Sequence, residues 1–156
     1  MFQRILTAIN QNDTSHLVFE KALTLAKSLN AHLILVHVLS PDLQRPTLVS
    51  YSYPMITEEI MQQFRQQWEA LEQAGLEQLK GLADQAIAAN VQTEFTQNVG
   101  NPGHVICTLA QNWNADLIVM GRREHSALGE LIMGSVSQFV MHHAPCSVLL
   151  VQDAEK

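Results

Sequence analysis

The sequence predicts one α/β domain, built on an open, mostly parallel five-stranded sheet with helices on both faces. Three observations lead to this prediction. Short apolar runs of strand length recur along the chain, segments with helical spacing separate them, and 47% of the 156 residues are hydrophobic. Alternating strands and helices join parallel strands by helical crossovers, and a chain of this length can enclose one substantial core.

The first two strands are predicted at residues 4–9 and 31–39. The second is a continuous apolar run, AHLILVHVL, which suits a strand covered on both faces. Between them, Asp13, Thr14 or Ser15 is expected to cap a helix of about four turns. Its apolar residues recur at helical spacing: Val18, Ala22, Leu25, Ala26 and Leu29.

A long loop and a long helix follow. Residues 40–54 contain three prolines and no periodicity, and loops of this length in a compact domain are often functional. Residues 57–89 form an amphipathic pattern that predicts one helix, with Gly75 as the expected place of any bend.

The second half of the chain contains three further strands and two helices. Gly100, Pro102 and Gly103 are expected to break the chain after the third strand, and Pro145 to stop the last helix. The predicted strands are 91–99, 115–121 and 146–152, and the predicted helices are 104–113 and 135–144.

Composition narrows the class of protein. Nine basic residues against fifteen acidic ones give a net charge of −6, which argues against nucleic acid as a partner. The N-terminus lacks the pattern of a signal peptide and no apolar run is long enough to span a bilayer, so we expect no membrane association and a cytoplasmic location. Cys107 and Cys146 lack metal-ligand spacing and are expected to be buried and inert.

The segment 120–135, MGRREHSALGELIMGS, contains three of the seven glycines and follows a predicted buried strand. Ligands of open parallel sheets bind at the carboxyl ends of strands, near the point where strand order reverses. Gly121 and the start of a helix at Gly134-Ser135 could therefore present backbone N–H groups to a phosphate, with hydroxyls from Ser135 and Ser137. From spacing alone, the segment is equally well interpreted as an ordinary connection between a strand and a helix. Neither a P-loop nor a G-x-G-x-x-G pattern is present.

Metal and catalytic sites have little support in the sequence. His32 and His37 fall on opposite faces of a regular strand, and His142 and His143 diverge by about 100° on a helix. Neither pair is suited to chelate one ion, so we expect no metal site built by the protein alone. No serine, histidine and aspartate lie in a recognisable catalytic context, so no catalytic residue is predicted.

Four stretches of sequence, together with the order of elements, resemble the universal stress protein family over essentially the whole chain. They are ILTAI near the start, LILVHV in the second strand, VGNP after the third, and HAPCSVLLV at the C-terminus. The resemblance implies a Rossmann-like fold in a single domain, 1–156.

The resemblance also implies an adenine-nucleotide site, because nucleotide-binding members carry the motif G-x2-G-x9-G-[ST]. Gly121 matches its first glycine and Gly134-Ser135 match its last pair. The matching positions imply contacts to ATP, ADP or AMP, with Mg²⁺ arriving through the phosphates. The implied binding residues are Ala8, Ile9, Asn10, Val38, Gly100, Met120, Gly121, Arg122, Arg123, Glu124, Gly134, Ser135, Val136 and Ser137.

Two positions depart from the family pattern. Glu124 stands where the motif has its middle glycine, and a carboxylate beside phosphates weakens their binding, although Arg122, Arg123 and His125 offset part of the charge. Asn10 stands where the family often has an aspartate that contacts the ribose, and an amide can still bond a hydroxyl. The sequence therefore favours AMP or ADP over ATP.

The expected role is a homodimeric sensor or regulator of a stress response, acting on a protein partner that the sequence does not identify. The apolar last strand, CSVLLVQ, is expected to pair with a second copy, as in the family. Two alternatives stay open: a member that has lost nucleotide binding and acts as an interaction module, and a slow ATPase.

Overall fold

The computed structural model describes residues 1–41, 57–122 and 134–152, and its sheet confirms the predicted fold class. Five strands form one sheet in the order β3-β2-β1-β4-β5, and all neighbouring pairs run parallel. The strands are β1 (Arg4–Ala8), β2 (His32–Leu39), β3 (Thr93–Val99), β4 (Leu117–Gly121) and β5 (Ser147–Val151). The helices are α1 (Ser15–Leu29), α2 (Glu58–Ala88), α3 (Pro102–Asn112) and α4 (Ser135–His143).

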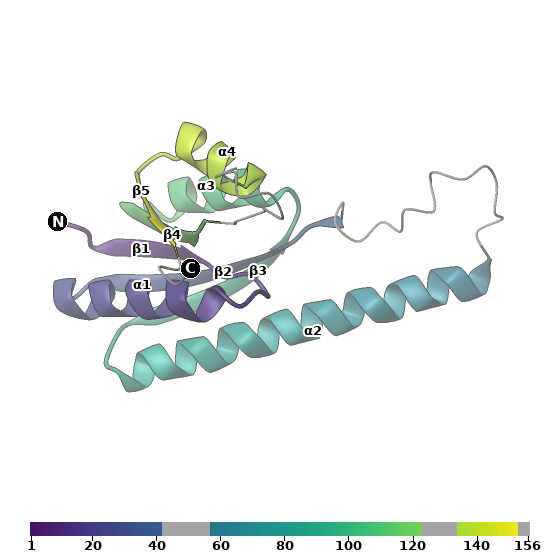
Figure 1. Cartoon of the computed structure of the whole chain (residues 1–156). Coiled ribbons are helices and arrows are strands. Elements are labelled where there is room, and N and C mark those ends of the chain that lie inside the picture. Colours follow the sequence, from purple (N-terminus) through teal and green to yellow (C-terminus); the bar gives the residue numbers. More distant parts are fainter. Residues whose placement is uncertain (42–56, 123–133, 153–156) are drawn as a thin grey trace.

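The helices cover the sheet in two pairs. Figure 1 shows α1 and α2 on one face of the sheet and α3 and α4 on the other, with α2 extending well beyond the strands. Each pair packs over its own buried apolar cluster. Strand order reverses at β1, since β2 and β3 follow on one side of it and β4 and β5 lie on the other.

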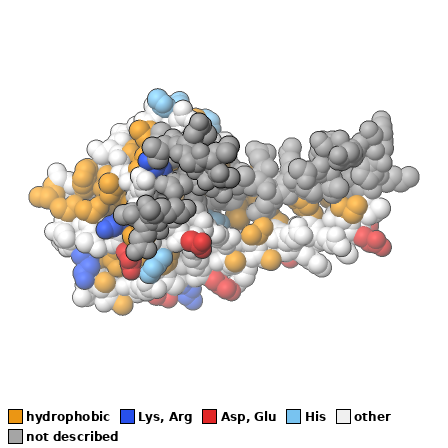
Figure 2. Space-filling view, in the orientation of Figure 1, with side chains coloured by type: hydrophobic (Ala, Val, Ile, Leu, Met, Phe, Trp, Pro, Cys, Tyr) orange, Lys and Arg blue, Asp and Glu red, His pale blue; other side chains and the backbone are white. Residues whose placement is uncertain are grey.

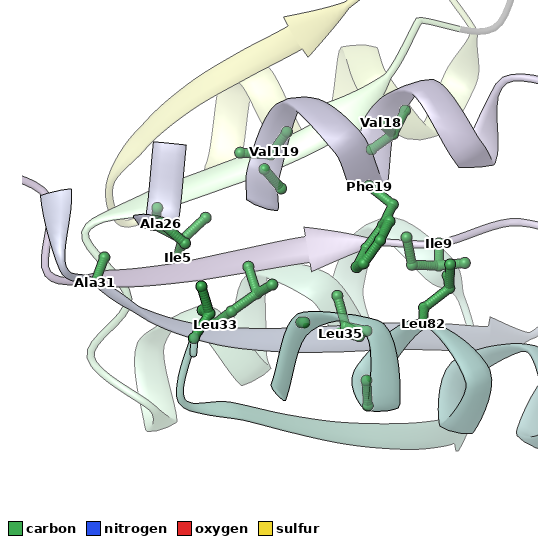
Figure 3. Packing of buried hydrophobic residues seen from close by; sticks show 14 of the residues in the cluster. Ile5, Ile9, Val18, Phe19, Ala26, Ala31, Leu33, Leu35, Leu82 and Val119 are labelled. Carbon is green, nitrogen blue, oxygen red and sulfur yellow. The ribbon is translucent and has the colours of Figure 1, made fainter. Parts of the chain in front are cut away.

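The core beneath α1 and α2 is formed by inward-facing residues of the central strands. Ile5 and Leu33 are fully buried, and Phe19 from α1 is the largest fully buried side chain. Figure 3 shows Phe19 of α1 and Leu82 of α2 pointing toward Ile9, the residue that follows β1. Both helices therefore pack against the point where β1 ends and its loop begins.

Helix starts and ends follow local signals. The predicted helix at 104–113 begins two residues earlier, because Pro102 suits the first helical position and Asn101 accepts a hydrogen bond from His104 N at 3.3 Å. Three helices are followed within two residues by an asparagine with positive φ (52–62°), a conformation that asparagine tolerates better than most residues. These are Asn30, Asn90 and Asn114.

α2 runs as one uninterrupted helix from Glu58 to Ala88 through Gly75. A side chain at Gly75 would collide with the ring of His37 and the amide of Gln97, so glycine is required by this close approach. The expected loop 40–54 is described only at Ser40 and Pro41, and its remainder lies outside the described residues.

Thr7, in the central strand β1, is fully buried, and its hydroxyl has no hydrogen-bond partner among the described residues. A buried hydroxyl without a partner costs free energy that an isosteric methyl group does not. We therefore expect Thr7→Val to raise the free energy of unfolding by about 1 kcal/mol, measured by urea denaturation.

The matched control is Thr93→Val, because the Thr93 hydroxyl donates to the carbonyl of Val91 at 3.0 Å. That variant loses a bond and should gain no stability. A Thr7→Val protein that unfolds more easily than the wild type would contradict this account of the core.

Candidate functional site

A pocket of about 240 Å³ lies at the carboxyl ends of the central strands, where strand order reverses. Five segments converge on it: the ends of β1, β2 and β4, and the first turns of α3 and α4. Its described lining comprises Ala8, Ile9, Asn10, Gln11, Asn12, Val36, His37, Val38, Leu39, Ser40, Pro102, Ile106, Met120, Gly121, Gly134, Ser135, Val136 and Ser137.

Ten of the fourteen residues named from the sequence line this pocket. They are Ala8, Ile9, Asn10, Val38, Met120, Gly121, Gly134, Ser135, Val136 and Ser137. Their convergence shows that these distant segments form one site, while the role of each toward a ligand stays a prediction.

Four named residues do not line the pocket or fall outside the described chain. Gly100 donates its N–H to the carbonyl of Leu39 at 3.0 Å and has φ near 150°, so it shapes the turn that ends β3 beside the pocket wall. The Arg122 side chain donates to Gln152 Oε1 at 3.0 Å, at the end of β5, and Arg122 is not among the lining residues. Arg123 and Glu124 lie outside the described residues.

One end of the pocket is formed by Gly121 and the first turn of α4. Helix N-termini carry unpaired N–H groups and partial positive charge, which favour an anion. Ser135 is exposed there, directly after the N-cap residue Gly134. Ser137 is buried and donates its hydroxyl proton to the carbonyl of Gly134 at 3.0 Å. Its proton therefore orients this turn, and Ser135 is the hydroxyl donor left for a ligand.

The opposite end is formed by the loop after β1. Buried Ser15 directs its hydroxyl to Asn10 O and Asn12 Oδ1, and Gln78 of α2 donates its side-chain amide to Asn10 O at 3.3 Å. Of the three predicted caps for α1, Thr14 occupies the N-cap position, but its hydroxyl makes no capping bond to the helix and donates to Asn12 Oδ1 at 3.1 Å. Ser15 makes the contacts to Asn10 and Asn12. This network fixes the loop that presents Asn10 and Asn12 to the pocket.

The end of β2 forms the back wall. Sequence reasoning named Val38 there but missed its neighbours Val36, Leu39 and Ser40, and also Ile106 of α3. The residues near the end of β2 could have been found from their position at the carboxyl end of a strand. Backbone at that end of a parallel strand lies at the ligand-binding edge of the sheet whatever its side chains are. The amides Gln11 and Asn12 could have been found in the same way, since they follow directly after β1.

His37, in the wall formed by β2, is linked to α2 through the side chain of Gln97. Its ring is buried, and the Gln97 amide donates to His37 Nδ1 at 2.9 Å and to the carbonyl of Glu72 at 3.2 Å. Because Nδ1 accepts, the ring is neutral with its proton on Nε2. Burial lowers the pKa of His37 from its ordinary value of 6.5.

The described lining has no Asp, Glu, Lys or Arg side chain. Among the residues that the structure describes, no group of three His, Cys, Asp or Glu side chains is arranged to hold a metal ion. Cys107 and Cys146 are half-buried, and burial raises the pKa of both thiols. In the described ranges no helix is long and apolar enough to cross a membrane.

A pocket at the strand-order reversal of a parallel sheet lies where open α/β proteins usually bind their ligands. Comparison with known proteins supplies the family. The family model for the universal stress protein family matches residues 1–152. The chain is 31% identical to universal stress protein Sll1388 of Synechocystis sp. over 151 residues, 97% of this chain and 98% of the relative. It is 40% identical to universal stress protein Slr1101 of the same organism over 100 residues, 64% of this chain and 93% of the relative.

The protein belongs to the universal stress protein family. Solved structures share its fold. A universal stress protein UspA from Lactobacillus plantarum has a TM-score of 0.73 at 21% identity, covering 96% of this chain and 97% of that one. A universal stress protein solved in complex with cAMP has a TM-score of 0.65 at 23% identity, covering 97% of each chain. An Archaeoglobus fulgidus member solved with dAMP has a TM-score of 0.62 at 18% identity, covering 96% of this chain and 97% of that one.

The buried, neutral His37 predicts a pH dependence of stability. Its pKa is lower in the folded protein than in the unfolded chain, so the unfolded chain binds the proton first. The stabilising contribution is complete above about pH 6.5 and declines as the pH falls from there toward the folded-state pKa. We expect the wild type to lose more free energy of unfolding between pH 8 and pH 5 than His37→Gln does, in urea titrations.

His142→Gln is the control, because His142 is exposed on α4 and its loss should leave the wild-type pH dependence in place. If the wild type and His37→Gln lose equal free energy of unfolding between pH 8 and pH 5, then His37 does not contribute to the pH dependence of stability.

Proposed function

We propose that this protein binds an adenine nucleotide in the pocket and acts as a homodimeric sensor or regulator of a stress response. The observation that supports this most directly is the convergence of Gly121, the first turn of α4, the loop after β1 and the end of β2 on one pocket. Two structures of the same fold were solved with cAMP and dAMP, which are adenine nucleotides.

The chemistry of the lining suggests one orientation for the ligand. The apolar residues near β2 and α3 suit the base, with backbone groups at Val38 facing its edge. The amide side chain of Asn10 suits the ribose. The N–H groups at Ser135 and the open backbone at Gly121 suit the phosphates, through which Mg²⁺ would enter.

The charge around the pocket favours a nucleotide with fewer phosphates than ATP. The described lining supplies no Lys or Arg, so the phosphate end relies on backbone N–H groups and the dipole of α4. Glu124 replaces the middle glycine of the motif and adds negative charge to the segment that follows β4. AMP and ADP are therefore the expected ligands, with ATP disfavoured.

Calorimetry with AMP, ADP and ATP tests the proposal. We expect AMP or ADP to bind more tightly than ATP, and Glu124→Gly to raise ATP affinity by roughly tenfold, the effect of about 1.4 kcal/mol of relieved repulsion. A matched control is Glu77→Gln on exposed α2, which removes the same charge away from the pocket lining.

Each contrary outcome has a distinct meaning. A clear preference of the wild type for ATP would contradict the charge argument. Failure of all three nucleotides to bind either the wild type or Glu124→Gly would favour the alternative of an interaction module. Phosphate release well above background that Ser135→Ala abolishes would favour the slow ATPase.

The homodimer is proposed through β5. This strand forms one edge of the sheet, and Leu149 is 37% exposed on it. An apolar edge strand with free backbone groups favours pairing with a second copy.

We expect sedimentation velocity to show a wild-type dimer and Leu149→Lys to shift it toward monomer, with the dissociation constant of the dimer raised by about tenfold or more. Leu76→Lys is the control, because Leu76 is 38% exposed on α2. A monomeric wild type, or a dimer unaffected by Leu149→Lys, would refute this interface.

A further inference from the structure

We propose that Ser40 is a ligand-binding residue, whose hydroxyl accepts a hydrogen bond from the exocyclic amino group of a bound adenine base. The inference rests on the proposed function and assigns one group of the ligand to one side chain of the pocket. It gives Ser40 a role in specificity, since a purine without that amino group has no hydrogen to donate there. The inference follows from the burial of Ser40, from its place in the pocket wall and from the direction of β2.

The protein buries the Ser40 hydroxyl without pairing it. Ser40 directly follows β2, is only 8% exposed and lines the pocket. In the described part of the chain, no residue forms a hydrogen bond with its side chain. The hydroxyl of Thr7 is also unpaired but is fully enclosed, whereas the Ser40 oxygen is not. A buried hydroxyl without a partner costs free energy, so a ligand that reaches Ser40 gains a hydrogen bond that the protein alone lacks.

The alternation of side chains along β2 places Ser40 on the pocket side of the sheet. Val36 belongs to the apolar cluster beneath α3 and α4, and Val38 packs against it. Leu33 and Leu35 belong to the cluster beneath α1 and α2. Because successive side chains of a strand point to opposite faces, Ser40 falls on the face of Val36 and Val38, which both line the pocket. The hydroxyl therefore follows two apolar side chains on this wall.

The backbone N–H and C=O groups of Val38 face the pocket. The carbonyl of Val36 accepts from Ile9 N at 2.7 Å on the β1 side, and the carbonyl of Leu39 accepts from Gly100 N at 3.0 Å on the β3 side. Since backbone groups alternate between the two sides of a strand, both groups of Val38 point to the β1 side. The pairing of β1 with β2 ends at Val36, and none of the described residues pairs with Val38 on that side.

The order of these two groups orients a base toward Ser40. Along the chain the N–H of Val38 precedes its C=O, so an adenine that pairs with both places a ring nitrogen at the N–H and its amino group at the C=O. This order is the same for both edges of adenine that carry the amino group, because each combines one acceptor nitrogen with that donor. The C=O end lies toward Ser40. One amino hydrogen is donated to Val38, and the second is directed to the side of the Ser40 hydroxyl, which can accept it.

The test is calorimetry with 5′-AMP and purine riboside 5′-monophosphate, a ligand that differs from 5′-AMP in lacking the amino group. We expect Ser40→Ala to weaken the binding of 5′-AMP by about fivefold and to leave the affinity for purine riboside 5′-monophosphate unchanged. The same variant should not lower the free energy of unfolding of the ligand-free protein in urea, because it removes a hydroxyl that has no partner there. Weaker binding without lower stability separates a contact to the ligand from a structural role.

Thr7→Val is the matched control. It also removes a buried hydroxyl that has no partner among the described residues, but Thr7 does not line the pocket. We expect this variant to bind both ligands as the wild type does.

The two proposals fail in different ways. If Ser40→Ala binds 5′-AMP as tightly as the wild type, or loses affinity for both ligands equally, the inference is overturned while nucleotide binding stands. If the wild type binds neither ligand, the proposed function is wrong and the inference falls with it.

Discussion

The handedness of the crossovers between parallel strands determines where the pocket lies in this protein. Such crossovers are right-handed, so moving from β1 to β2 and β3 places α1 and α2 on one face of the sheet. The return to β4 and β5 runs in the opposite direction and places α3 and α4 on the other face. Between β1 and β4 the connections therefore diverge to opposite faces, and the pocket lies at that divergence.

Several polar side chains around this pocket are used to hold backbone rather than to meet a ligand. Ser15 holds the loop after β1, and Ser137 holds the first turn of α4. Gly100 holds the end of β2 through the carbonyl of Leu39. Together they hold the backbone donors and amide groups of the pocket in place, and groups held in this way lose less conformational entropy in any binding event.

Local periodicity was enough to predict the fold. Every strand predicted from an apolar run is present, and the element ends differ by no more than two residues. The convergence of Asn10, Val38, Gly121 and Ser135 could also be anticipated, because carboxyl ends of parallel strands share one edge.

What the sequence did not reveal depends on contacts between distant segments. Gln78 reaches Asn10 across 68 positions, and His37 meets Gln97 across 60. No local pattern marks such pairs. In the sequence, Gly75 marks only a place where a bend can form, whereas its close approach to the ring of His37 is visible only in the structure. Ser137 was expected to donate to a phosphate, and only the structure shows its proton directed to Gly134.

We propose the N-terminus of α4 as an anion site within an adenine-nucleotide pocket. Amide ¹⁵N chemical shifts during parallel titrations with adenosine and 5′-AMP test it most directly. We expect the amide of Val38 to shift with both ligands, and those of Ser135 and Val136 to shift with 5′-AMP alone, because only that ligand carries a phosphate. Unmoved Ser135 and Val136 amides at saturating 5′-AMP would contradict it.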